Sequence, residues 1–159
     1  MWRVAPERDV FETLVAPGTF AYPNGIVLAW TGKLLVAHGT GIAVVDPATG
    51  MFERMPAAPG RPLGGIDGLL IDGHTLYAVQ NGLGAPRVVA IALDDAGAAT
   101  TALTVLENDP GTLEIPTTSA LFDGALYTIA NSQLDAIGPG GLRADKQLRD
   151  PRIVRTPLP

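Results

Sequence analysis

The chain has 159 residues, of which 47% are hydrophobic and only 17% are charged, a composition too apolar for a disordered protein. The formal net charge is −5, and only 11 residues are Lys or Arg, so no basic surface for phosphate backbones and no nucleic-acid partner are expected. The sequence contains no Cys, which excludes disulfides, thiolate metal sites and thiol nucleophiles.

The N-terminal segment is charged, and the apolar runs along the chain are short. MWRVAPERDVFETL carries charges where a signal peptide has an apolar stretch. The longest apolar runs, such as VVAIAL at 88–93, are far shorter than the ~20 residues that span a bilayer. We therefore expect no membrane partner and, in the absence of a signal peptide, the cytoplasm as the default location.

Three segments of the chain share one pattern: PNGIVLAWTGKLLVAHG, IDGLLIDGHTLYAVQNG and PTTSALFDGALYTIANS. Each contains a polar corner, an apolar strand, a Gly-containing turn and a second apolar strand that ends in polar residues. The corner residues Asn24, Asp67 and Thr117 recur at the roughly 40- to 50-residue period of propeller blades. The repeat therefore indicates blade-like units.

The first two units continue into a third and a fourth strand. GIAVVDPATG and RVVAIALDDAG end in residues typical of hairpin turns, and MFERMPA and TTALTVLE follow as fourth strands. Gly and Pro recur too often for an uninterrupted helix of ordinary length. The predicted fold is all-β: a β-propeller segment of about three four-stranded antiparallel blades, which is half of a six-bladed propeller.

The pattern makes residues 1–159 a single propeller segment with incomplete ends. Residues 22–63 and 64–112 are predicted to be whole blades, whereas 1–21 and 113–159 are partial. MWRVAP and VFETLVA have the character of third and fourth strands, and RIVRTPL that of a third strand without a fourth. Exposed strand edges attract partners, so two copies are expected to form a homodimer that closes a six-bladed ring.

The corners PNGIVLAW, IDGLLID and TTSALF together resemble the second half of the regucalcin and gluconolactonase family, six-bladed propellers that hydrolyse sugar lactones around a divalent metal. The resemblance covers nearly this whole chain but about half of a family member. It implies that Asn24 and Asp67 are metal ligands and that Asp67 is the catalytic general base. The family's other ligands, a Glu and a second Asn, belong to blades that this chain lacks, and Ile66 stands where the family usually has Pro.

Two interpretations of the corners are open. Asn-Gly and Asp-Gly are common turns, because Asn and Asp tolerate left-handed backbone and Gly relaxes the next step. Alternatively, the loops that enter the innermost strands lie at the mouth of the central channel and aim Asn24, Asp67 and Thr117 at its axis. Oxygen ligands make calcium the expected metal, with magnesium, manganese and, less well matched, zinc as alternatives.

Polar residues also end the second strand of each unit. In a propeller these positions reach the channel mouth, which together with Thr117 gives a set of candidate contacts to a small-molecule substrate: His38, Gln80, Asn81, Thr117 and Asn131. The alternative is that these residues only cap strands.

Other polar residues have plainer interpretations. His74 in DGHTL is expected to be exposed at a hairpin on the opposite face, Glu114 to be an exposed loop carboxylate, and Asp94 and Asp95 to be solvated in a turn. The sequence has no G-x-S-x-G nucleophile elbow and no H-E-x-x-H zinc motif.

The leading hypothesis is a metal-dependent hydrolase of the sugar-lactone type, or half of one. The metal would polarise the ester carbonyl, and Asp67 would take a proton from the attacking water. The alternatives are a non-catalytic propeller that binds a ligand or a protein, and an inactive truncated fragment.

Overall fold

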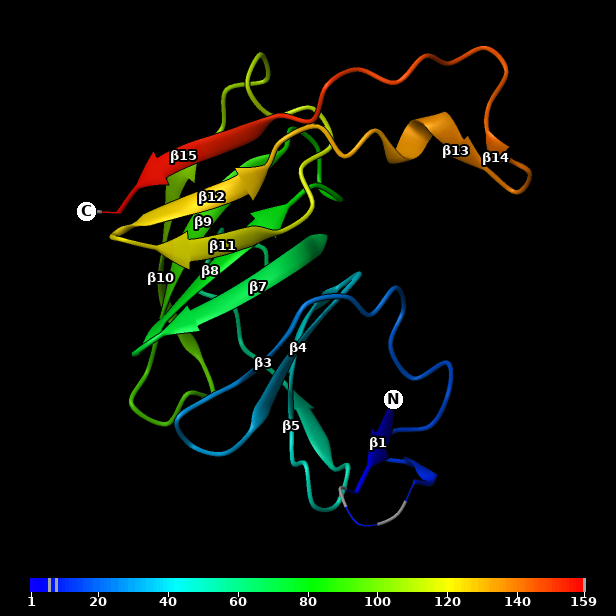
Figure 1. Ribbon diagram of the computed structural model, residues 1–159. Coiled ribbons are helices and arrows are strands. Elements are labelled where there is room, and N and C mark those ends of the chain that lie inside the picture. Colours follow the sequence, from blue (N-terminus) through cyan, green and yellow to red (C-terminus); the bar gives the residue numbers. More distant parts are fainter. Residues whose placement is uncertain (6, 8, 159) are drawn as a thin grey trace.

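The computed structural model describes residues 1–5, 7 and 9–158, which form antiparallel β-sheets and one short 3-10 helix, η1 (Leu134–Ala136) (Figure 1). The strands are β1 (Trp2–Val4), β2 (Phe11–Thr13), β3 (Ile26–Leu28), β4 (Leu34–His38), β5 (Gly41–Val45), β6 (Phe52–Arg54), β7 (Ile66–Asp72), β8 (Thr75–Gln80), β9 (Arg87–Leu93), β10 (Thr100–Glu107), β11 (Ser119–Phe122), β12 (Ala125–Ile129), β13 (Ile137–Gly138), β14 (Gly141–Leu142) and β15 (Ile153–Pro157).

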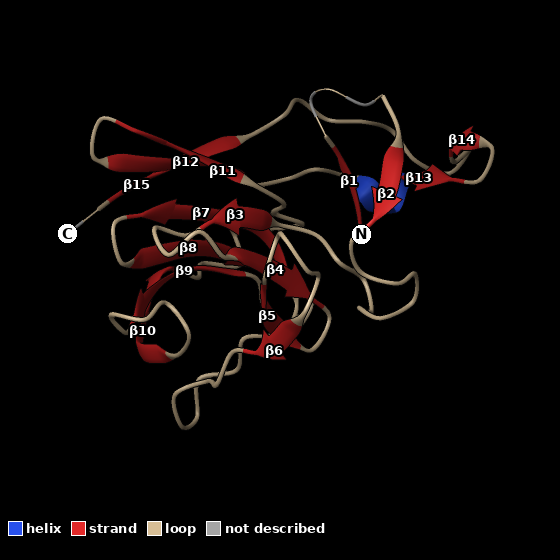
Figure 2. Cartoon of the chain, turned by 90° about the horizontal axis from the view of Figure 1, so that it is seen from below, coloured by secondary structure: helices blue, strands red, loops and turns tan. Residues whose placement is uncertain are grey.

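Two sheets have four strands each in simple chain order, β3-β4-β5-β6 and β7-β8-β9-β10. They lie side by side, as Figure 2 shows from below. A third sheet has the order β11-β12-β15, and β1 and β2 form a two-stranded sheet. The prediction of an all-β fold built from four-stranded antiparallel units is thus confirmed. Within the described residues, no helix has the length and hydropathy needed to cross a bilayer.

The first strands of neighbouring sheets, β3, β7 and β11, come unusually close at the corner glycines Gly25 and Gly68. The Gly25 amide donates a hydrogen bond to the Asp67 carbonyl at 2.7 Å. A Cβ on Gly25 would lie 2.7 Å from that same oxygen, and a Cβ on Gly68 would lie 2.7 Å from the Cα of Thr118. Any larger residue would therefore push two backbones apart at these points, so glycine is required there for space.

The expectation that Asn24 and Asp67 form turns with left-handed backbone is wrong. Among the described residues, the non-glycine positions with positive φ are Tyr22, Asp123 and Gln133, and neither Asn24 nor Asp67 is among them. The corner glycines do not have positive φ either. At the repeated corners, the first strands of adjacent sheets pack backbone against backbone.

Each seam between neighbouring sheets has its own buried apolar layer. In the largest cluster, Leu35 and Ile42 of the first four-stranded sheet share a core with Leu76 and Ile91 of the second. A second cluster joins the β7–β10 sheet to the β11-β12-β15 sheet through residues such as Val79 and Leu126, whose neighbours lie on both sides of the seam. The alternating apolar positions of the strands thus hold the sheets together in series.

Aspartates fix the turns after the third strands. Asp46 Oδ1 accepts hydrogen bonds from the amides of Ala48 and Thr49 at 2.8 and 3.0 Å, and Lys33 Nζ lies 2.6 Å from Oδ2. The Lys33 bond and then the two amide bonds lower the pKa of Asp46 to about 2. Asp94 caps the next blade's turn in the same manner through the amides of residues 98 and 99, as the turn sequences predicted.

An excursion between β12 and β15 was not predicted. It contains η1 and the short β13–β14 hairpin and is fastened at its return by Glu114, which pairs with Arg152 at 2.9 Å and also with Arg149. The expectation that Glu114 is an exposed loop carboxylate is therefore wrong, because the residue is half-buried and paired with two arginines. Its hydrogen bond with Arg149, together with the positive charge of both arginines, lowers its pKa.

The outer sheets expose large apolar side chains. On the β1–β2 pair, Trp2 and Phe11 are 60% and 76% exposed, and on the last sheet Phe122 and Ile153 are 70% and 56% exposed. These two sheets lie at the two ends of the series, where a closed propeller would place further blades.

The close approach of the first strands yields a stability prediction. Gly25→Ala and Gly68→Ala should each lower the free energy of unfolding by about 1–3 kcal/mol, because the added methyl overlaps a neighbouring backbone. Gly140→Ala is the matched control, since a Cβ there meets nothing within 4 Å and the residue lacks a positive φ. Urea unfolding of the three variants measures the difference, and equal midpoints for all three would contradict the packing argument.

Candidate functional site

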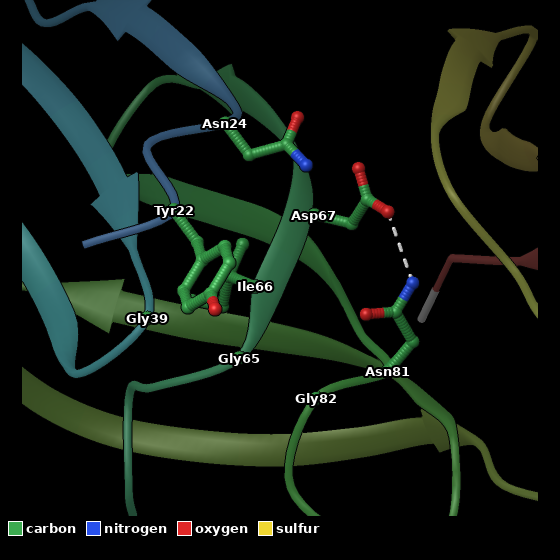
Figure 3. Close-up of a pocket in the computed structure, with 8 residues that line it drawn as sticks. All are labelled: Tyr22, Asn24, Gly39, Gly65, Ile66, Asp67, Asn81 and Gly82. Atoms are coloured by element: carbon green, nitrogen blue, oxygen red, sulfur yellow. Dashed lines mark hydrogen bonds between the residues drawn. The ribbon is translucent and has the colours of Figure 1, made fainter. Parts of the chain in front are cut away.

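A pocket of about 330 Å³ opens at the end of the sheets where β3 and β7 begin and β4 and β8 end (Figure 3). It is lined by Tyr22, Asn24, Gly39, Gly65, Ile66, Asp67, Asn81 and Gly82.

Three polar side chains from separate segments meet in this pocket. Asn24 precedes β3, Asp67 is the second residue of β7, and Asn81 follows β8. Asn81 Nδ2 donates to Asp67 Oδ2 at 2.9 Å and to the carbonyl of Pro116 at 2.6 Å. Figure 3 shows the Asn24 amide extended toward the Asp67 carboxylate. The fold therefore brings together Asn24, Asp67 and Asn81, all three of which the sequence singled out.

The Asp67 carboxylate is held at one oxygen and open at the other. Oδ2 accepts the Asn81 bond, whereas no side chain of the described residues donates to Oδ1. Figure 3 shows this second oxygen on the side of Asn24. The arrangement fixes the carboxylate plane while leaving a charged acceptor free to bind a cation, a water molecule or a hydroxyl group.

The donor atoms fit a hard divalent cation in kind. One carboxylate and two amides offer oxygen ligands, which calcium, magnesium and manganese prefer. Calcium takes 6–8 oxygens, however, and within the described residues no group of three or more His, Cys, Asp and Glu side chains could hold a metal ion. These residues could therefore supply only part of the coordination shell that calcium needs.

Gln80 does not line the pocket although it adjoins Asn81. Its side chain is buried, and its Nε2 donates to the carbonyls of Pro62 and Gly64 at 3.0 and 2.9 Å. Its Oε1 accepts from Arg87 Nε at 2.8 Å. Gln80 thus supports the loop that carries Gly65 into the pocket.

His38 also lies outside the pocket. Its ring is buried and stacks on Phe20 with 5.3 Å between centroids, and Nδ1 lies 3.3 Å from the Thr40 hydroxyl. Burial, and then the positive charge of Arg54, lower the pKa of His38. The neutral imidazole is therefore the form that the fold favours.

The two remaining candidates belong to the backbone framework. Asn131 is buried, donates from Nδ2 to the carbonyl of Asp150 at 3.0 Å and accepts from the Arg152 amide at 2.6 Å, so it anchors the excursion. Thr117 adjoins Pro116, the second acceptor of Asn81, and donates its own amide to the carbonyl of Ile129 at 3.2 Å. Neither side chain lines the pocket.

His74 is exposed on a hairpin, as expected, but it is not without neighbours. Its ring lies parallel to that of Trp30 with centroids 4.0 Å apart, and Nδ1 lies 3.8 Å from Asp95. Trp30 belongs to the first four-stranded unit and His74 to the second, so the stack joins the two units.

Five residues that line the pocket were not predicted as site residues: Tyr22, Gly39, Gly65, Ile66 and Gly82. The glycines form walls of bare backbone, which sequence patterns do not distinguish from ordinary turns. Tyr22 has φ 50°, an unusual backbone conformation that only the structure reveals. The sequence feature that could have pointed to Tyr22 is its place as an aromatic residue directly before the Pro-Asn-Gly corner.

The lowered pKa of His38 gives a prediction about pH. Because the unfolded chain binds a proton more readily than the folded one, the free energy of unfolding should fall as pH drops below the ordinary histidine pKa of 6.5. His38→Phe keeps an aromatic ring at this position, so its free energy of unfolding should fall less between about pH 7.5 and about pH 5 in the same buffers. Urea titrations at each pH measure this slope, and parallel curves for the two proteins would show that His38 does not contribute.

Comparison with known proteins supports the fold and leaves the family open. No family model matches the chain, and no curated protein matches it. Among solved structures, the PQQ-bound aldose sugar dehydrogenase of Streptomyces coelicolor superposes with a TM-score of 0.60 at 18% sequence identity. The match covers 91% of this chain and 46% of that one, so the chain spans about half the length of this neighbour. The neighbour is a β-propeller protein, and the chain described here has the fold of a partial β-propeller.

Proposed function

We propose that this chain is a propeller segment that hydrolyses sugar lactones with the help of a divalent cation, with calcium as the first choice. The observation that carries the proposal is the Asp67 carboxylate, which Asn81 holds at one oxygen while the other faces the pocket beside Asn24. Further support comes from the motif resemblance and from a structural neighbour whose name states that it acts on aldose sugars.

Each residue has a distinct role in the proposed reaction. Asp67 accepts a proton from water at its open oxygen as that water attacks the lactone carbonyl carbon. The ring C–O bond then breaks, and the departing ring oxygen takes this proton back from Asp67 and leaves as a hydroxyl group, which restores the carboxylate. Asn81 keeps the carboxylate oriented, and Asn24 contributes a neutral amide oxygen as a ligand. A bound divalent cation would supply Lewis acidity to the carbonyl.

A non-catalytic ligand-binding propeller is the second candidate. It is favoured by the small number of charged ligand groups, because the described residues that line the pocket include one carboxylate, Asp67, and two side-chain amides. A cation with so few protein ligands would bind weakly. An inactive fragment, which needs the rest of a propeller before it can act, would show the same weak binding.

The catalytic proposal predicts that Asp67→Asn lowers lactone hydrolysis by about 10²- to 10⁴-fold, the usual contribution of a general base. Asn24→Ala should weaken calcium binding, because it removes one ligand. Asp72→Asn is the matched control, since this exposed carboxylate lies at the far end of the same strand, β7. Hydrolysis of D-glucono-1,5-lactone is followed by pH-stat, and calcium binding by calorimetry.

Two outcomes would reject the catalytic proposal. One is unchanged hydrolysis in Asp67→Asn. The other is the absence of both hydrolysis and calcium binding in the unsubstituted chain, which would favour the ligand-binding propeller or the inactive fragment.

We also propose that two copies of the chain associate through their outer sheets. The exposed apolar residues on β1–β2 and on the β11-β12-β15 sheet provide the surfaces, and β15 offers an open edge. A two-fold ring would place a second Asn24 and a second Asp67 around the same channel, where they could complete the ligand set.

Light scattering should then report twice the mass of one chain, with or without calcium. Ile153→Lys should lower this mass, because it places a charge on the exposed face of β15. Met51→Lys, which is also exposed but precedes β6 away from the outer sheets, should leave the mass unchanged. A single-chain mass for the unsubstituted protein at all concentrations would refute the dimer.

A further inference from the structure

Tyr22 presents an aromatic ring at the pocket with no partner within the described part of the chain. The residue is 88% exposed although it lines the pocket, and Figure 3 shows the ring beside Ile66 on the side of the pocket opposite Asn81. No hydrogen bond or ring contact with another described residue involves it. A large apolar surface at a polar pocket gains free energy only when a ligand covers it.

The backbone at Tyr22 is held in an unfavourable conformation. A φ of 50° is left-handed, which is uncommon for a bulky residue, and a residue before proline normally prefers extended backbone. The chain is nevertheless fixed on both sides of Tyr22. The Gly39 amide donates to the carbonyl of Ala21 at 2.6 Å, and the Asn24 amide donates to the carbonyl of Ala37 at 3.0 Å. Strain of this kind is concentrated at functional sites.

The residues around the ring leave room for a flat ligand. A Cβ on Gly39 would lie 3.1 Å from the Ala21 carbonyl and 3.5 Å from the Tyr22 ring, so this glycine allows the loop to sit against the end of β4. Gly65 and Gly82 line the same pocket without side chains. The volume of about 330 Å³ is at the small end of ligand pockets and suits one ring of substrate.

We infer that Tyr22 is the stacking platform for the ring of a sugar-type ligand, and that its left-handed backbone holds the platform in place before the ligand arrives. The C–H face of a pyranose or furanose ring packs on the aromatic ring, while the ring hydroxyls reach Asp67 and the amides of Asn24 and Asn81. The inference rests on the proposed function in placing the substrate in this pocket, but it concerns binding of the ring and does not require hydrolysis.

The test separates the ring of Tyr22 from its backbone. The probe is methyl β-D-glucopyranoside, a sugar ring with no lactone to hydrolyse, and binding is measured by saturation-transfer NMR and calorimetry. Tyr22→Phe should bind with nearly unchanged affinity. Tyr22→Gly should bind about five- to tenfold more weakly, because the stacking surface is lost. The melting temperature of Tyr22→Gly should be equal to that of the unsubstituted chain or higher by up to about 2 °C, because glycine adopts positive φ without strain.

Each outcome decides the inference independently of catalysis. Sugar binding that depends on Tyr22 in a protein without lactone hydrolysis would support the platform and reject the proposed function. Equal binding by Tyr22→Gly and the unsubstituted chain, or no binding by either, would overturn the platform even if hydrolysis is found. A Tyr22→Gly variant that melts at a lower temperature and binds weakly would also overturn it, since the ring would then be part of the structural framework.

Discussion

The contact on which the structure depends is the backbone-to-backbone approach of the first strands at Gly25 and Gly68. At Gly25 the two backbone segments are near enough for the Gly25 amide to donate a direct hydrogen bond to the carbonyl of Asp67. Such proximity also determines where the preceding residues lie, because Asn24 and Asp67 are each one residue away from a contact point. The functional candidates are therefore placed by the same packing that holds the sheets in series, and the site needs no separate scaffold.

A second connection crosses the next seam. Asn81 follows β8 and bonds both to Asp67 on its own sheet and to the carbonyl of Pro116, which leads into β11. The orientation of the Asp67 carboxylate thus depends on how the third sheet docks against the second. A shift of the third sheet that moves Pro116 would therefore also move the Asp67 carboxylate, because the side-chain amide of Asn81 bonds to both.

The sequence was sufficient for the architecture because a repeated pattern of corner, strand and turn leaves few alternatives to antiparallel blades. It also identified Asn24 and Asp67, from the repeated corners that lead into the first strands, and Asn81, from the polar residues that end the second strands. It could not choose between Gln80 and Asn81, which are neighbours with similar chemistry. Their environments differ because successive side chains leave a strand on opposite faces, and only the packed loop at residues 62–65 shows which side is buried.

Other features left no signal in the sequence. The direction of the His38 ring depends on a distant stacking partner, Phe20, and the excursion after β12 has no hydrophobic period to reveal it. The backbone strain at Tyr22 arises from hydrogen bonds on both sides of the residue, which a local pattern does not encode.

The connections from the second to the third strand of each sheet become longer along the chain, and this has a consequence for access. Residues 39–40 join β4 to β5, residues 81–86 join β8 to β9, and residues 130–152 join β12 to β15. The last of these connections, the excursion, projects away from the sheets (Figure 1). A molecule that approaches the pocket therefore meets much more chain beside the third sheet than beside the turn at residues 39–40.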